Sequence, residues 1–424
     1  MHKSRHIATL VLLVMLSALP AMLAQDSDED IRLNPELGTV AANLDNNKKY
    51  SYIKYDENHI DLNGDNWNEL AEKLQQSLQE GEFTIVHIGD SHIQADGNTG
   101  TTRRLFQNKY GDAGRGIIIP FRLAGTNEPL DYTITSDSKF VKATLMRRPW
   151  PTEMGFTGVS LHPEYQEFSF NIKVKSPVGY FRILCEGDLS VLKITSGGKD
   201  IDFEAEKDYE GVDVSMSSDL TEFKISMSGN DVNIYGFDLR NDTSGVLYHA
   251  IGNNGAAYSS YNSLPEFGKS LSSLHPDLII ISLGTNEAFG KFNDEAFTAQ
   301  LATMVRRVRA SLPEAKILLV TPSECQKSVY TTKRTGKGRN RRTRKIKSYQ
   351  VNQNVVRVRN LILDYGKKNH IPVYDFYTVA GGEGASGKWL ADKLLSTDRI
   401  HRTWEGYRVD GALMYDALVE QLEN

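Results

Sequence analysis

The stretch FTIVHIGDSH, residues 83–92, decides the fold class of this chain. Residues 83–88 form a short apolar run rich in β-branched side chains, which is typical of a strand buried on both faces of a parallel sheet. The run leads directly into Gly89, Asp90 and Ser91. A glycine permits a tight turn after such a strand, and active crevices of open α/β sheets lie at the carboxyl ends of the strands. The stretch therefore predicts a parallel sheet with Ser91 at its carboxyl edge.

Patterns on both sides of this stretch predict an α/β domain. Apolar residues recur at helical spacing over residues 67–78, and from residue 245 onward short apolar runs alternate with helical patterns. The predicted strands are residues 246–251, 278–283, 316–321 and 372–375, and the predicted helices are residues 294–311, residues 351–368 and a closing helix from Trp404. Such alternation indicates parallel strands that are joined by crossover helices.

Residues 119–242 have a different texture. Short alternating runs, such as residues 168–174, are separated by glycine-containing turns, and helical patterns are nearly absent. Alternation at this spacing predicts an all-β sandwich or barrel. Because α/β patterns lie on both sides, we expect an inserted domain that divides an α/β domain into residues 65–118 and residues 243–424.

The N-terminus has the layout of a secretory signal peptide. Basic residues precede an apolar run over residues 7–19, which meets Pro20 and ends in small residues. The alternative is an uncleaved membrane anchor, but a membrane-spanning helix needs about 20 apolar residues. We therefore expect residues 1–24 to be a signal peptide, followed by a polar, irregularly packed N-terminal arm over residues 25–64.

Charge and cysteine content limit the classes of function. The chain has a formal net charge of −5, and loss of the predicted signal peptide would remove two positive charges and change it to −7. This mild acidity argues against nucleic acid as the main partner. The two cysteines, Cys185 and Cys325, form neither a disulfide framework nor a metal-ligand spacing. They are either two buried free thiols or a single disulfide bridge.

A basic run departs from this acidic composition. Residues 333–347 are rich in arginine and lysine in a background of glycine and threonine. We interpret them as a long mobile loop after the predicted strand at residues 316–321. The loop is either simply solvated or an electrostatic contact for an anionic cell-wall polymer or polysaccharide.

Two polar residues near predicted strand ends could take part in acyl transfer. Ser91 begins a helix, where backbone N–H groups can stabilise an oxyanion, although a serine at this place is also an ordinary helix cap. Asn286 follows the strand in DLIIISLGTNE, residues 277–287. Its amide can donate to an oxyanion, or it can be a turn residue.

Two further signals complete the set. Asp398 precedes His401 by three residues and can orient its imidazole to accept a serine proton, unless both residues share a surface loop by chance. Gly252 and Gly255 follow a predicted strand, where their backbone N–H groups can face a substrate.

The blocks HIGDSH, AIGNNGA, LGTNEAFG and DRIH, in this order, resemble those of SGNH (GDSL-type) hydrolases. The resemblance implies a three-layer α/β/α fold around a parallel sheet. It also implies that Ser91 is the nucleophile and that His401 is the base oriented by Asp398. The oxyanion hole would consist of the backbone N–H groups of Ser91 and Gly255 and the side chain of Asn286.

GDSH in place of the commoner GDSL, the β-rich insertion before AIGNNGA, and the phrases NNGA and GTNEA carry a narrower resemblance. It is to bacterial peptidoglycan O-acetylesterases, in which an inserted module is similar to a carbohydrate-binding β-sandwich. It implies a periplasmic or secreted serine esterase that acts on an acetylated carbohydrate polymer. We expect no metal, no organic cofactor, no nucleic-acid partner and no stable membrane anchor after signal cleavage. The alternatives are an O-acetyltransferase with the same triad, a lipid or thioester hydrolase, and a non-catalytic glycan-binding protein. The sequence leaves the oligomeric state open.

Two other histidines flank the serine turn. His87 lies within the predicted strand, and we expect a hydrogen-bonded core histidine. His92 follows Ser91 directly, so it either packs beside the site or contacts substrate; we favour packing. Glu287 is interpreted as a cap, a salt-bridge partner or a substrate contact.

Overall fold

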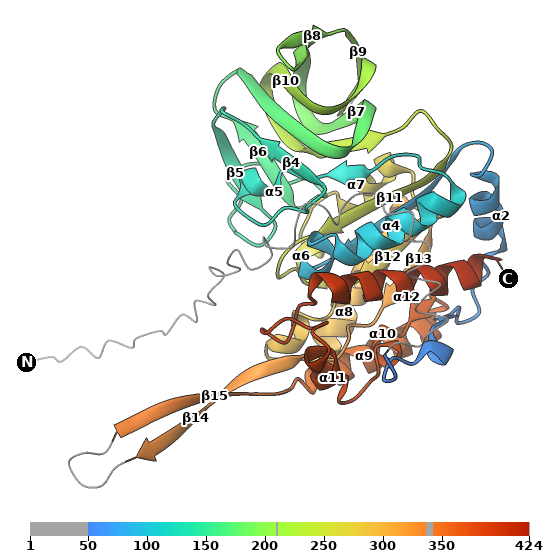
Figure 1. The fold of residues 1–424 in the computed structure, drawn as a ribbon, viewed down its shortest axis with the longest axis vertical. Coiled ribbons are helices and arrows are strands. Elements are labelled where there is room, and N and C mark those ends of the chain that lie inside the picture. The colour runs from blue at the N-terminus through green and yellow to red at the C-terminus, as the bar shows by residue number, and fades with distance from the viewer. Residues whose placement is uncertain (1–49, 209–210, 336–341, 424) are drawn as a thin grey trace, which may run out of the picture.

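A computed structural model describes residues 50–208, 211–335 and 342–423 of the chain (Figure 1). The predicted signal peptide and the first part of the predicted N-terminal arm lie outside the described residues. Figure 1 shows an α/β part, a β-rich part beside it in green, and a hairpin that projects from the α/β part in orange. Within the described ranges, no helix is both long and apolar enough to span a membrane.

A sheet of six strands forms the centre of the α/β part. Across the sheet their order is β1 (Ile60–Asp61), β16 (Val373–Tyr374), β13 (Lys316–Val320), β12 (Leu278–Ser282), β2 (Glu82–Gly89) and β11 (Gly245–Gly252). All neighbours are parallel except β1, which is antiparallel to β16. The buried apolar runs of β2, β11 and β12 suit such a sheet, because both of its faces are covered. The predicted α/β class is confirmed.

Alternate residues of β2 enter two separate hydrophobic cores, because successive strand side chains point to opposite faces. Phe83 and Ile85 belong to one core, and Val86 and Ile88 belong to the other. Helices that contribute to the first core include α2 (Asn68–Gln76), α4 (Gly97–Tyr110), α11 (Ala385–Ala391) and α12 (Trp404–Glu423). Helices that contribute to the second core include α6 (Tyr258–Asn262), α7 (Phe267–Leu271), α8 (Asp294–Ser311) and α9 (Asn354–Asn369).

Helix α8 spans the residues that the apolar spacing predicts, and its ends have local causes. The Asn293 side chain caps the helix by accepting the N–H of Ala296 at 2.8 Å. Asp294 and Glu295 in the first turn and Arg309 in the last turn complement the helix dipole.

Residues 50–64 contain more regular structure than the sequence analysis predicts. Tyr50 and Ile53 are buried in a core, and β1 extends the main sheet at its edge.

The remaining short helices are η1 (Tyr55–Glu57), α3 (Ser91–Gln94), α5 (Phe121–Ala124), η2 (Ser272–Leu274), η3 (Glu287–Phe289) and α10 (Phe376–Val379).

The β-rich part lies between α4 and β11 in the chain and forms a sheet of eight strands. They are β3 (Gly116–Ile118), β4 (Tyr132–Thr135), β5 (Phe140–Thr144), β6 (Val159–Pro163), β7 (Glu167–Ser196), β8 (Lys199–Ile201), β9 (Phe203–Lys207) and β10 (Gly211–Arg240). Their order is β4-β7-β10-β6-β5, with β3 and β9 paired to β10 and β8 paired to β7. A third core, which includes Phe170, Phe181 and Phe237, lies within it.

The basic run is a hairpin, so the predicted long loop was wrong. Strands β14 (Gln326–Thr335) and β15 (Arg342–Val351) are antiparallel and form a separate two-stranded sheet. The prediction relied on charge and glycine content and gave too little weight to the threonine, valine, isoleucine and tyrosine residues, which favour strands. Residues 336–341 of the run lie outside the described residues.

Both cysteines are buried free thiols. Cys185 lies in the core of the β-rich part, whereas Cys325 lies in a core of the α/β part. Burial raises the pKa of each thiol to about 12, so neither is present as a reactive thiolate at neutral pH.

Candidate active site

The carboxyl ends of three neighbouring strands meet at the candidate site. Gly89 at the end of β2 pairs with Gly252 at the end of β11, and β12 pairs with the other side of β2. Because these strands are parallel and in register, the segments that follow them leave the sheet side by side. These segments bear Ser91, Gly255 and Asn286, three residues that the sequence singles out.

Ser91 is linked by hydrogen bonds to the predicted acid and base pair. The Ser91 Oγ lies 2.8 Å from the His401 Nε2, and the His401 Nδ1 lies 2.7 Å from the Asp398 Oδ2. The other oxygen of Asp398 accepts the N–H groups of Ile400 and His401 at 2.9 and 3.0 Å. This arrangement fixes the imidazole so that Nδ1 donates to the carboxylate and Nε2 accepts the serine proton.

The pKa values of His401 and Asp398 suit proton transfer near neutral pH. Burial opposes protonation of His401, but the hydrogen bond and charge of Asp398, together with the charge of Asp90, outweigh it and raise the His401 pKa above 6.5. Burial alone would raise the pKa of Asp398, but its hydrogen bonds and the charge of His401 lower it below 3.8. Asp398 is therefore a carboxylate at neutral pH.

His92 packs beside the imidazole of His401. The two ring centroids are 5.3 Å apart, and the Tyr407 hydroxyl lies 3.2 Å from the His92 Nδ1. Burial, and then the nearby positive charges of His401 and Arg402, lower the His92 pKa well below 6.5. His92 is therefore a neutral packing neighbour of His401, as favoured from the sequence.

The two candidate glycines differ in their surroundings. Gly252 is buried against helix α3, where a Cβ would lie 2.0 Å from the backbone nitrogen of Gln94. Gly255 is exposed with φ +80°, and the nearest atom to a Cβ there would be the Cε of Met146 at 3.7 Å. Gly252 is thus required for packing, whereas a Cβ at the exposed Gly255 would make only an ordinary van der Waals contact.

Asn286 connects the serine turn to the Gly255 loop. Its Nδ2 donates to the Asp90 Oδ2 at 3.2 Å and to the Ala256 carbonyl at 2.9 Å. Both amide protons therefore have acceptors, and the longer bond to Asp90 is the weaker of the two. An oxyanion next to Ser91 would have to share or replace that bond.

Two buried carboxyl groups support this part of the site, and one was not identified from the sequence. Asp90 caps α3 by accepting the N–H of His92 at 3.0 Å, and burial raises its pKa to about 6. Glu287 accepts the N–H of Tyr258 at 2.9 Å, and burial raises its pKa to about 7. Of the interpretations of Glu287, the structure supports the cap, here at the start of α6.

A polar network from the β-rich part also reaches the site and was missed in the sequence. The Gln94 side chain donates to the Thr126 Oγ1 at 3.0 Å and to the Asn127 carbonyl at 2.7 Å. It also accepts the N–H of Asn254, which precedes Gly255, at 2.7 Å. The only sequence signal for Gln94 was its place one turn after Ser91 on a short helix.

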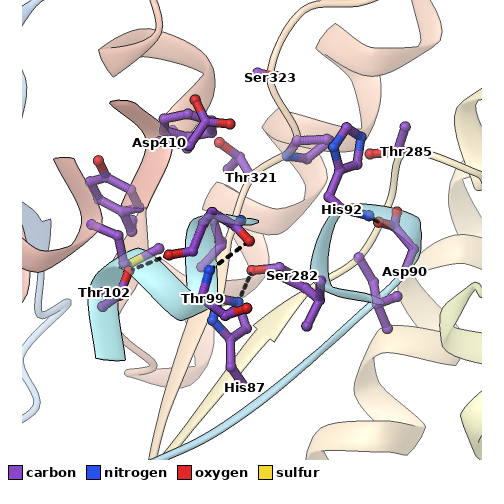
Figure 2. Close-up of a pocket in the computed structure, with 18 residues that line it drawn as sticks. His87, Asp90, His92, Thr99, Thr102, Ser282, Thr285, Thr321, Ser323 and Asp410 are labelled. Atoms are coloured by element: carbon purple, nitrogen blue, oxygen red, sulfur yellow. Dashed lines mark hydrogen bonds between the residues drawn. The ribbon is translucent and has the colours of Figure 1, made fainter. Parts of the chain in front are cut away.

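A cavity of about 60 Å³ borders the serine turn, and Figure 2 shows the residues that line it. Its lining includes His87, Asp90 and His92 but none of the three linked residues Ser91, His401 and Asp398. His87 lies 2.6 Å from the Ser282 Oγ and 2.8 Å from the Tyr248 hydroxyl, and burial lowers its pKa to about 3. It is a neutral, hydrogen-bonded core histidine, as expected.

In the described part of the chain, no group of three or more His, Cys, Asp or Glu side chains is arranged to hold a metal ion.

We expect Gly252→Ala to destabilise the protein by about 2–3 kcal/mol, because the added methyl group overlaps with α3 and forces the backbone to move. The matched control Gly255→Ala should cost only about 1–2 kcal/mol, since it adds left-handed strain but no overlap with a neighbouring atom. Denaturant unfolding of both variants gives the comparison. Equal losses would contradict the assignment of Gly252 to packing.

Residues 233–409 match the model of the GDSL-like lipase/acylhydrolase family. The match includes Gly255, Asn286, Asp398 and His401, whereas Ser91 lies before it. No curated protein matched the sequence.

Among solved structures, a peptidoglycan O-acetylesterase matches with 20% identity and a TM-score of 0.66, covering 86% of this chain and 97% of that chain. A lipase/acylhydrolase from Enterococcus faecalis matches with 20% identity and a TM-score of 0.30, covering 41% of this chain and 76% of its own. A carbohydrate esterase of family 3 from Talaromyces cellulolyticus matches with 15% identity and a TM-score of 0.30, covering 41% and 72%. The first likeness extends over both the α/β and the β-rich part and establishes the fold.

Proposed function

We propose that the chain, which matches the GDSL-like lipase/acylhydrolase model over residues 233–409 and has the fold of a peptidoglycan O-acetylesterase, is an exported serine esterase of the SGNH type. It removes O-acetyl groups from peptidoglycan or another polysaccharide. The observation that carries this proposal is the chain of hydrogen bonds from Ser91 through His401 to Asp398, beside the open Gly255 loop. The substrate named for the structural neighbour supports a carbohydrate polymer.

The first half of the reaction forms an acyl-enzyme. His401 accepts the Ser91 proton at Nε2 while Oγ attacks the ester carbonyl carbon, and Asp398 stabilises the resulting imidazolium. The negative oxygen of the tetrahedral intermediate is held by the N–H groups of Ser91 and Gly255 and by the Asn286 amide. His401 then gives its proton to the leaving sugar oxygen as the ester bond breaks, which leaves an acetyl group on Ser91.

The second half releases acetate. His401 removes a proton from a water molecule as its oxygen attacks the acetyl carbon, and it returns the proton to Ser91 Oγ when the acyl bond breaks. If a sugar hydroxyl takes the place of water, the same residues act as an O-acetyltransferase. The two activities therefore differ only in the nucleophile that is accepted.

The proposal includes the finer architecture expected from the sequence. Two cores on opposite faces of the main sheet support a three-layer α/β/α arrangement. In the β-rich part, residues 224–228 of β10 lie between two segments of β7, and residues 180–184 of β7 lie between two segments of β10. This register supports two stacked layers around one core, that is, an inserted carbohydrate-binding-like sandwich near residues 119–242.

Export and localisation to the periplasm or the cell exterior rest on the layout of residues 1–24. A polymer outside the cytoplasm is also the substrate that such an esterase would meet. Mass determination of the protein isolated after secretion tests this point, because cleavage after Ala24 removes a defined mass.

The test of the activity is acetate release by purified protein from O-acetylated peptidoglycan, acetylated xylan and a chromogenic acetyl ester. Parallel samples are treated with a fluorophosphonate, which modifies an activated serine. Release that the reagent abolishes supports the esterase, and the relative rates identify the preferred polymer. If folded protein releases no acetate from any substrate, the esterase is refuted. Acetyl transfer to a sugar then supports the transferase, and polymer binding without turnover supports a glycan-binding protein.

We expect Asn286→Ala to lower kcat about 100- to 1,000-fold, because it removes one donor to the oxyanion. Binding of the ground-state ester should change little, so KM should stay within a few-fold. Asn262→Ala, which removes another partly buried amide of the α/β part, is the matched control. A similar kcat for Asn286→Ala and wild type would show that Asn286 is not an oxyanion donor.

A further inference from the structure

The hairpin of β14 and β15 has a charge opposite to that of the remaining chain. Residues 326–351 contain ten lysine and arginine residues and no aspartate or glutamate. Because the whole chain has a formal charge of −5, all other residues together carry −15. Strands β14 and β15 project from the α/β part, so the positive charge of their described residues stands away from the acidic body (Figure 1).

These charges do not stabilise the hairpin itself. Lys333 lies directly opposite Arg344 across the strands, and like charges in such pairs are destabilising. A two-stranded hairpin is marginally stable even without such repulsion. The side chains of both residues are exposed, and no ion pair of either is seen. A role for these charges in the folded hairpin alone therefore has no support.

One face of the hairpin carries both lysine side chains and tyrosine rings. Directly paired residues share a face, and the pairs Ser328–Tyr349, Tyr330–Lys347 and Thr332–Lys345 are successive on the same face. The Tyr330 side chain is 63% exposed. The Lys347 Nζ lies 4.9 Å from the centre of the Tyr349 ring. The exposed ring and the neighbouring lysines form a continuous surface.

This face begins at the loop that holds the catalytic base. Arg399 lies between Asp398 and His401 in sequence, and its guanidinium carbon lies 4.1 Å from the centre of the Tyr349 ring. Arg399 also donates to the Gln326 Oε1 at 2.7 Å, and the Gln326 N–H donates to the Arg399 carbonyl at 3.0 Å. The cationic and aromatic face is thus attached directly to the loop beside Ser91.

We propose that this face of the hairpin binds a carboxylate-bearing polysaccharide and guides its acetylated sugars to Ser91. The inference rests on the proposed esterase function and specifies its substrate as an anionic glycan. Lysine and arginine side chains attract carboxylates, whereas a tyrosine ring offers an apolar face to a sugar ring. An anionic membrane would call for a larger apolar surface than Tyr330 and Ile346, which are the exposed large apolar residues of the described hairpin.

The test compares two variants that each lose three positive charges. The hairpin variant carries Arg334→Gln, Lys345→Gln and Lys347→Gln, all on the face of Tyr330 and Tyr349. The control variant carries Lys54→Gln, Lys175→Gln and Lys199→Gln, which are exposed lysines elsewhere on the described chain. Both should hydrolyse a small neutral acetyl ester at the wild-type rate, which shows that fold and active site are intact.

Binding is then measured by co-sedimentation with peptidoglycan sacculi, with Ser91→Ala added to each protein to prevent turnover. We expect the hairpin variant to bind roughly 10-fold or more weakly than the control variant at low salt, with the difference reduced at high salt. Sacculi whose carboxylates have been converted to neutral amides should bind the two variants equally.

Equal binding of the two variants to untreated sacculi would overturn the proposal. Hairpin-dependent binding that is tighter to duplex DNA or to anionic lipid vesicles than to sacculi would overturn it in favour of that partner. The proposed esterase function is judged separately by hydrolysis of the small ester by the wild-type protein. If the wild-type protein does not hydrolyse the small ester, the hairpin cannot guide a substrate to Ser91. The binding comparison would still show whether the hairpin holds an anionic glycan.

Discussion

Replacement of Ser91 by alanine is expected to lower kcat at least about 1,000-fold and to abolish covalent labelling by a fluorophosphonate. The Ser91 hydroxyl is hydrogen-bonded to the His401 Nε2, and its loss removes the atom that would form the acyl-enzyme. The fold should not suffer, because Asp90 and not Ser91 caps helix α3. The free energy of unfolding should therefore change by less than about 0.5 kcal/mol.

The matched control is Ser259→Ala, which changes an exposed serine of α6 close to the Gly255 loop. It should keep wild-type turnover and labelling. Labelling that persists in Ser91→Ala and disappears in another serine variant would assign the nucleophile elsewhere and refute the proposed mechanism.

Replacement of Asp398 by asparagine is expected to lower kcat about 1,000- to 10,000-fold with little change in KM. The asparagine amide can donate to the His401 Nδ1 and thereby favour the tautomer in which Nε2 carries the proton. That tautomer cannot accept the Ser91 proton. Asp364→Asn, at an exposed position on α9, is the matched control and should be fully active.

The pH dependence gives a second measurement for the same pair. In the wild type, kcat/KM should fall as pH decreases through the His401 pKa, which lies above 6.5. In Asp398→Asn, burial still opposes protonation of the imidazole, but the negative charge that favours protonation is gone. The His401 pKa should therefore fall, and the decrease of kcat/KM should occur at lower pH than in the wild type. If kcat/KM falls at the same pH in both proteins, Asp398 does not act on His401.

The same shifts fix the pH window in which the pair stabilises the fold. The pKa of Asp398 is lowered by folding, so its contribution is present above about 3.8 and is lost as pH falls through the folded pKa. The pKa of His401 is raised, so its contribution is present below about 6.5 and is lost as pH rises through the folded pKa. Both contributions are therefore fully present between about pH 3.8 and about pH 6.5, and each is lost as the pH moves from that window through the folded pKa of its group.

Much of the α/β part could be predicted because local pattern and tertiary environment agree there. The apolar run of β2 is long enough for one strand and is followed at once by glycine, so only a buried parallel strand fits it. Helix α8 has its apolar spacing, its cap and its charged ends within its own sequence. Such elements are encoded by neighbouring residues.

The errors concern elements whose pattern is weak or masked by charge. β1 has only two residues, and its partner β16 lies more than 300 residues away in the sequence. A segment of two residues is too short to show a strand periodicity, so β1 could not be predicted. The hairpin of β14 and β15 has like charges opposite each other, and this composition is typical of a solvated loop. In both cases strand pairing, which sequence spacing does not report, decides the structure.

The sequence alone determined the α/β class and the identity of Ser91, Asp398, His401 and Asn286 as candidates, because each lies at a predictable strand end or in a recognisable block. Only the tertiary structure brought Ser91 within 2.8 Å of His401, a residue 310 positions later in the chain. The tertiary structure also showed that the two glycines have different roles. Gly252 is buried against α3, where a side chain would clash, whereas Gly255 is exposed. Finally, it joined the basic hairpin to the loop of His401. Such contacts between distant segments arise from strand register and packing, which no local stretch of sequence contains.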